Sequence, residues 1–80
     1  MKQELFNYLK SFMIECKDEW KNWNTAKQAR AMFTTLCFVG NIDADTLECD
    51  NMLLTLYNVS DMENIMEYDE FESFMVELIV

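Results

Sequence analysis

The chain has 80 residues, enough for one small domain; 51% of them are apolar, and it contains one glycine and no proline. This composition excludes a disordered segment, and so few turn residues argue against hairpin-rich β structure. A net charge of −9 opposes direct binding to nucleic-acid phosphates. We therefore expect a single all-α domain over residues 1–80, a small compact bundle of four to five short helices.

The first predicted helix runs from Lys2 to Lys21. Its apolar residues recur every three or four positions, which indicates one buried face. That face comprises Leu5, Phe6, Leu9, Phe12, Met13, Cys16 and Trp20. Two tryptophans near lysines could stack on bases, but we assign Trp20 to the core and Trp23 to the turn that follows.

A second helix is predicted from Thr25 to Gly40. Thr25 followed by Gln28 is a capping-box pattern, which places the N-terminus of the helix there. Gly40 is expected to end the helix in the left-handed conformation that glycine adopts without strain. The segment Cys37–Asp45 could instead form a short strand and a turn, and this alternative stays open.

A third helix is predicted to begin at Asp43, whose side chain can cap it, and to end at residue 58 or 59. Asp45 in its first turn would complement the helix dipole. Leu47 and Leu54 are expected to contact two neighbouring elements. The inner face is expected to hold Cys49, Met52, Leu53, Leu56 and Tyr57.

The remaining residues predict two short helices rather than one. Ser60 followed by Glu63 is a second capping-box pattern. At ~100° of rotation per residue, the apolar residues of 62–66 and of 71–78 face opposite directions, so that one straight helix cannot bury both. We predict a helix over about 61–67, a break near Tyr68, and a helix over about 69–79, where Asp69 and Glu72 repeat the cap pattern. The last three residues are expected to pack against the core.

The segment Asn64–Met75, NIMEYDEFESFM, resembles the end of an EF-hand calcium loop with its exiting helix. With Glu70 at the twelfth, bidentate position, carboxylates remain at positions three and five. The same alignment puts Val59, which has no side-chain oxygen, at position one, and asparagine where the sharp turn needs glycine. We therefore expect no calcium site, and no other metal or cofactor.

Catalytic chemistry has no clear residue set in this sequence. Histidine, the usual general base and zinc ligand, is absent, and so are a glycine-rich phosphate loop and a nucleophile elbow. Eighty residues also leave little room for a cleft. We expect a protein that is not an enzyme.

The cysteines and the hydropathy pattern bear on location. Cys16, Cys37 and Cys49 form no CxxC spacing, and we interpret them as reduced and mostly buried, with an intermolecular disulfide as the alternative. No signal peptide and no apolar run of membrane-spanning length is evident. These features predict a cytoplasmic protein that does not bind membranes.

Charge is unevenly distributed along the chain. The first thirty residues hold six basic and four acidic residues, a net charge of +2, whereas the remaining fifty hold eleven acidic residues and no basic one. A long stretch of one sign tolerates self-repulsion, which suggests a field directed at a positively charged partner. A solvated surface without any partner is the alternative.

We predict that the acidic residues bind a basic, nucleic-acid-binding protein by occupying its phosphate-binding surface. Helical neighbours three or four residues apart lie ~5–6 Å from each other, a spacing of the same order as that between adjacent phosphates. The candidate contact residues are Asp43, Asp45, Glu48, Asp50, Glu63, Glu67, Glu70, Glu72 and Glu77.

In size, charge and helix content the chain resembles the small acidic inhibitors that phages and mobile elements make against host nucleases, and the acidic immunity proteins that block nuclease toxins. The resemblance implies a stoichiometric inhibitor in the bacterial cytoplasm. If a phage encodes the protein, this is the cytoplasm of the bacterial host. The alternative is a self-associating structural or assembly subunit, for instance a homodimer. Its basic first helix would meet the acidic half of a second copy through an interface rich in methionine and aromatic residues.

Overall fold

The computed structural model describes residues 1–79, which form four α-helices and two 3-10 turns without any strand. In chain order these elements are α1 (Lys2–Glu15), η1 (Lys17–Glu19), α2 (Trp23–Gly40), α3 (Leu47–Val59), η2 (Met62–Asn64) and α4 (Tyr68–Val76). The predicted all-α bundle is therefore confirmed. The alternative of a strand at Cys37 is wrong, because α2 continues through Gly40.

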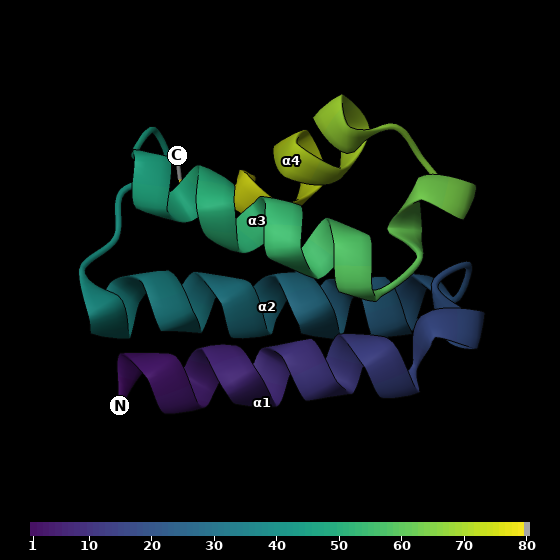
Figure 1. Cartoon of the computed structure of the whole chain (residues 1–80), viewed down its shortest axis with the longest axis horizontal. Coiled ribbons are helices and arrows are strands. Elements are labelled where there is room, and N and C mark those ends of the chain that lie inside the picture. Colours follow the sequence, from purple (N-terminus) through teal and green to yellow (C-terminus); the bar gives the residue numbers. More distant parts are fainter. Residues whose placement is uncertain (80) are drawn as a thin grey trace.

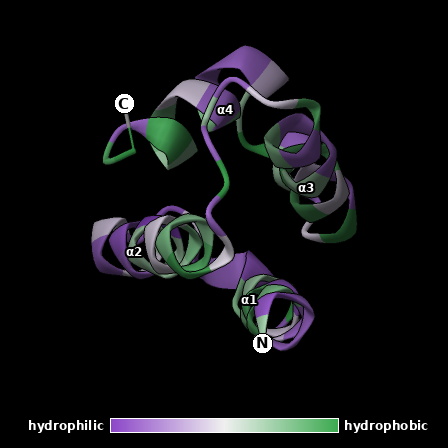
Figure 2. Cartoon of the chain, turned by 90° about the vertical axis from the view of Figure 1, so that its left-hand side faces the viewer, coloured by the Kyte–Doolittle hydropathy of each residue, from purple (hydrophilic) through white to green (hydrophobic). Residues whose placement is uncertain are grey.

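The helices surround one core. α1 and α2 form an antiparallel hairpin, and α3 and α4 lie over it (Figure 1). An end-on view shows all four helices arranged around a common centre (Figure 2). The largest fully buried apolar side chains come from every helix: Leu9, Met13, Phe33, Leu36, Leu53, Leu56, Phe71 and Met75. Burial of these side chains is the main stabilising contribution in a domain of this size.

α1 ends at Glu15, well before the predicted end at Lys21. Cys16 leaves helical geometry with φ −100° and ψ 17°, and the 3-10 turn η1 follows. This change of direction brings Trp20 back into the core, where it is 6% exposed. A straight helix would carry Trp20 past the start of α2, so the burial of this large side chain explains the early end.

α2 begins two residues earlier than the predicted cap at Thr25. Asn22 is the N-cap: its backbone is extended, and its side-chain oxygen accepts a hydrogen bond from the N–H of Asn24 at 2.9 Å. Thr25 lies buried in the first turn instead. The predicted capping box is therefore wrong, because a competent cap residue stands just before it in the chain.

At the other end of α2, Gly40 is still helical and Asn41 adopts the left-handed conformation, with φ 55° and ψ 50°. The prediction assigned that role to glycine, but asparagine also tolerates it. Gly40 is instead needed for close packing between two helices. A Cβ there would lie 2.6 Å from Cδ of Lys2, so the absence of a side chain lets the start of α1 approach the end of α2.

α3 is capped by Thr46 and not by Asp43. The Thr46 hydroxyl accepts a hydrogen bond from the N–H of Cys49 at 3.2 Å and donates one to the carbonyl of Asp43 at 2.7 Å. Asp43 and Asp45 therefore lie in the loop before the helix. The reason is Ile42, which is 5% exposed and holds the start of this loop against the core. The predicted end at residue 58 or 59 is confirmed.

The outer face of α3 differs from the prediction as well. Cys49, Leu53 and Leu56 are buried as expected, but Leu47 is 74% exposed and Leu54 is 44% exposed. The expected contacts of these two leucines with neighbouring elements are wrong. Both point away from the core, because the buried residues take the opposite side of the helix.

The segment after α3 forms only the 3-10 turn η2, not the predicted helix over 61–67. Ser60 is completely buried, and its hydroxyl donates a 2.6 Å hydrogen bond to the carbonyl of Leu56 in the preceding turn. The hydroxyl is therefore not available as a cap. Asp61 then takes a left-handed conformation with φ 55°, which turns the chain away from the axis of α3.

The predicted break near Tyr68 is confirmed, since α4 starts at that residue. Its N-cap is Glu67, without a side-chain hydrogen bond, so the expected cap pattern of Asp69 and Glu72 is not used. Of the three C-terminal residues, Ile79 packs against the core and Leu78 is 53% exposed, while Val80 lies outside the described residues. The prediction is thus confirmed for Ile79 and wrong for Leu78.

Candidate protein-binding face

Three side-chain ion pairs within residues 1–79 connect the basic first part of the chain to its acidic remainder. Lys2 Nζ lies 2.7 Å from Glu48 Oε2, Lys17 Nζ lies 3.4 Å from Asp61 Oδ2, and Arg30 pairs with Glu77. Two of the nine predicted contact residues, Glu48 and Glu77, thus have a basic partner in their own chain. These two are the weakest candidates for contact with another protein.

Asp50 on α3 and Glu72 on α4 bring two separate acidic segments together. With Asp45 they line a hollow whose walls include Ala44 and Val76. Burial raises the pKa of Glu72, and its hydrogen bond with Asp50 and the charge of Asp50 raise this pKa further. The acidic loop before α3 and the acidic side of α4 therefore form one surface.

A second acidic group surrounds Tyr57 near the end of α3. Burial raises the pKa of the Tyr57 hydroxyl, and the negative charges of Glu67, Glu63 and Glu70 raise it further. The same hydroxyl donates a 2.7 Å hydrogen bond to the carbonyl of Met66. This bond attaches the segment that carries the three glutamates to α3.

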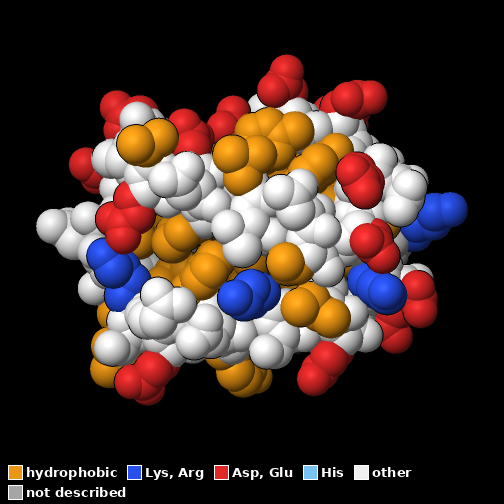
Figure 3. Space-filling view, viewed as in Figure 1, with side chains coloured by type: hydrophobic (Ala, Val, Ile, Leu, Met, Phe, Trp, Pro, Cys, Tyr) orange, Lys and Arg blue, Asp and Glu red, His pale blue; other side chains and the backbone are white. Residues whose placement is uncertain are grey.

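The two acidic groups are adjacent, because Tyr57 contacts Tyr68. The two rings meet edge to face, with centroids 5.4 Å apart. Burial raises the pKa of Tyr68 to about 12, and the charges of Glu72 and Asp50 contribute to this shift. Each tyrosine thus lies next to one acidic group. Figure 3 shows acidic side chains along the upper rim of the molecule, over α4 and near the start of α3.

We use the name acidic face for the predicted contact residues that form no ion pair in the described part of the chain. They are Asp43, Asp45, Asp50, Glu63, Glu67, Glu70 and Glu72. Asp69 also belongs to this side of α4, because its charge raises the pKa of Glu72, although it was not predicted. The two tyrosines were missed too, since no sequence pattern pairs residues of different helices.

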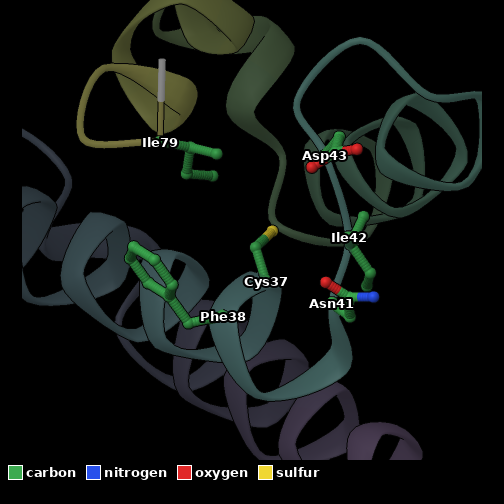
Figure 4. Close-up of a pocket in the computed structure, with 6 residues that line it drawn as sticks. All are labelled: Cys37, Phe38, Asn41, Ile42, Asp43 and Ile79. Atoms are coloured by element: carbon green, nitrogen blue, oxygen red, sulfur yellow. The ribbon is translucent and has the colours of Figure 1, made fainter.

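A small pocket adjoins one end of the acidic face. It has a volume of about 170 Å³ and is lined by Cys37, Phe38, Asn41, Ile42, Asp43 and Ile79. The sulfur of Cys37 points into the space beside Ile42 and Ile79 (Figure 4). Burial and the neighbouring thiol of Cys49 raise the pKa of Cys37 to about 12. The thiol is therefore protonated at neutral pH and a poor nucleophile.

Trp23 belongs to a cluster that joins the start of α2 to α4. It is 60% exposed, and its ring centroid lies 5.6 Å from that of Phe74. The guanidinium of Arg30 lies 4.5 Å from the Phe74 ring, and Lys27 Nζ lies 5.9 Å from the Trp23 ring. The prediction placed Trp23 in the turn between helices; it is the first residue of α2.

Comparison with protein-family models, with curated proteins and with solved structures finds no match for this chain. Within the described residues, acidic and cysteine side chains form no group of three that could hold a metal ion. Over the same part of the chain, the helices are too short or too polar to cross a membrane.

Proposed function

We propose that the protein is a non-catalytic binding module whose acidic face occupies the basic, nucleic-acid-binding surface of another protein and blocks it stoichiometrically. The observation that supports this proposal is the continuity of the acidic face across α3, η2 and α4. Asp50 and Glu72 join its parts on one side, and Tyr57 and Tyr68 join them on the other.

The electrostatics of such an encounter favour fast and salt-sensitive association. Complementary charge steers two proteins together and raises the association rate at low ionic strength. Asp50, Glu70 and Glu72 stand on helices, and Glu63 stands on a turn tied to α3. Little backbone entropy is therefore lost when a partner binds these carboxylates. Salt screens such exposed charges, with a Debye length of ~10 Å at 0.1 M.

The first experiment identifies the partner and its salt response. Tagged protein is incubated with nuclease-treated bacterial lysate and washed at low and at high salt. The proposal expects a basic, nucleic-acid-processing protein that is retained at low salt, released at high salt, and displaced by DNA or RNA. A retained protein that nucleic acid does not displace would contradict the proposed mode of inhibition.

A substitution series then tests the acidic face directly on the purified partner. Replacing Glu63, Glu67 and Glu70 by glutamine should weaken binding ~tenfold or more, because these charges act together on a cationic surface. The matched control replaces Glu4, Glu15 and Glu19, exposed acids of α1 and η1, and removes the same charge. Equal weakening by both triple variants would show that net charge, not the acidic face, determines binding.

A further inference from the structure

The outward ridge of α3 carries no charge in this strongly acidic protein. It consists of Leu47, Asn51, Leu54 and Asn58, all exposed, on the side of the helix opposite its buried residues. The two leucines are 74% and 44% exposed. An exposed leucine by itself is ordinary, but two on one uncharged ridge form a candidate contact surface.

The spacing of these four residues is that of a coiled-coil seam. Steps of four, three and four residues place both leucines at d positions and both asparagines at a positions of a heptad. Leucine at d suits two-stranded parallel coiled coils, and asparagine at a specifies register and pairing at some cost in stability. The ridge therefore has the pattern of a helix that packs against an identical helix in parallel.

The two flanks of this ridge carry opposite charge. On the α4 side lie Asp50 and Glu72, which line one hollow. On the α1 side, Phe6 and Glu48 line a hollow of about 420 Å³ beside Leu47. Glu48 is paired with Lys2, and Lys10 Nζ lies 5.5 Å from the Phe6 ring, so two basic side chains stand against one acidic side chain on this flank.

Figure 3 shows hydrophobic side chains in the upper middle of this face and between α3 and α1, a row of basic side chains through its lower half, and acidic side chains along the upper rim as well as at the lower edge. A two-fold axis parallel to α3 places the acidic flank of one copy over the basic flank of the other. An antiparallel pairing would bring like flanks together. Charge thus favours the same parallel arrangement that the heptad pattern indicates.

We propose that α3 is a dimerisation helix, on which a second copy of the chain packs in parallel through Leu47 and Leu54. In this arrangement Asn51 forms a hydrogen bond with the partner's Asn51 across the two-fold axis. The ridge itself contains none of the nine predicted acidic contact residues, although Asp50 and Glu72 flank it. The dimer requires no other partner, so this proposal does not rest on the proposed function.

The mass in solution tests the dimer. Light scattering or sedimentation from ~10 μM to ~1 mM, a range that covers weak association, should show the mass rise from 9.6 kDa toward twice that value. The double variant Leu47→Ser and Leu54→Ser should stay monomeric. Replacing Ile14 and Phe38, exposed apolar residues of α1 and α2, by serine should leave dimerisation unchanged. A constant monomer mass, or a dimer that tolerates the α3 double variant, would overturn the proposal.

Cross-linking tests the orientation. In a Cys16→Ser background, Asn51→Cys should form a disulfide with the partner's residue 51, because a parallel seam brings both to the two-fold axis. Diamide, a diazene, is the oxidant. The two thiols lose two hydrogens and form the disulfide bond, and diamide takes up both hydrogens to become the corresponding hydrazine. Gln28→Cys, on the exposed face of α2, should not cross-link. A dimer of the Asn51→Cys variant that fails to cross-link would overturn the parallel arrangement.

The glutamine variant at residues 63, 67 and 70 separates the two proposals. Dimerisation should survive that change within about twofold, since the leucines form the main contact and exposed charge pairs contribute little. Loss of partner binding with an intact dimer leaves both proposals standing. A parent protein that is monomeric, and whose partner binding is lost in this variant, leaves only the proposed function.

Discussion

The first thirty residues and the remaining fifty use charge in opposite ways. In the first part, Lys2, Lys17 and Arg30 pair with acids of the second part, and Lys10 and Lys27 lie over aromatic rings. In the second part, most of the eleven acids face solvent. Exposed ion pairs contribute only ~0–1 kcal/mol each. The fold therefore depends on its apolar core, and most of the acidic charge plays no part in holding it together.

The largest expected effect concerns the core that both parts share. Phe71→Ala should lower the free energy of unfolding by ~3–5 kcal/mol, because this side chain is fully buried. Phe12 is only half-buried on α1. Phe12→Ala should therefore lower the free energy of unfolding by ~1–2 kcal/mol less than Phe71→Ala does. Urea denaturation followed by circular dichroism measures both losses. Equal losses would mean that α1 contributes as much to the core as α4 does.

Arg30 tests how strongly the basic part binds the acidic part. Its side chain is 12% exposed, stacks on Phe74 and pairs with Glu77. Arg30→Ala should lower stability by ~1–2 kcal/mol through lost packing and the cation–π contact. Lys17→Ala, which removes an exposed ion pair, is the control and should change stability by less than ~0.5 kcal/mol. A similar small loss at both positions would show that the basic residues contribute only exposed pairs.

The pH dependence of stability that Glu72 causes tests the repulsion between acidic residues in the second part of the chain. Its native pKa is raised by burial and by Asp50, so its contribution to stability is full below the pKa of an unfolded glutamate. That contribution is lost as the pH rises through the raised native pKa. The Glu72→Gln variant should have the same Tm as the parent protein at acidic pH. At pH 7 its Tm should be ~2–4 °C higher than that of the parent protein.

Thermal unfolding between pH 4 and pH 7 measures the effect, and Glu70→Gln, an exposed acid of the same helix, is the matched control. If Glu72→Gln destabilises the protein at pH 7, the Glu72 carboxyl makes a favourable contribution at that pH, and repulsion from Asp50 is not the dominant interaction at this residue.

The smallest effect is one of reactivity and leaves stability unchanged. Cys37 and Cys49 are buried, and their pKa values are raised, whereas Cys16 is only half-buried. A chromogenic disulfide reagent at pH 8 should therefore react rapidly with one thiol of the native protein and with all three in urea. Rapid reaction of a second thiol would show that the interface between α2 and α3 opens readily.

Sequence patterns predicted the helices better than their ends. The buried faces follow from helical spacing, so Leu9, Phe33 and Leu53 could be assigned to the core in advance. The caps could not, because several residues compete for each one. Asn22, and not Thr25, is the N-cap of α2, because it comes earlier in the chain and has an extended backbone. Ser60 is not a cap, because its hydroxyl donates a hydrogen bond to the carbonyl of Leu56 in the preceding turn.

The sequence by itself determined the all-α class and the separation of charge, since composition and helical spacing are local properties of the chain. Only the tertiary structure decided which acidic groups meet. Asp50 reaches Glu72, and Tyr57 reaches Tyr68, because α4 folds back beside α3. The same packing leaves Leu47 and Leu54 outside the core. The rotation of each helix about its axis depends on contacts between distant residues, and no local pattern encodes it.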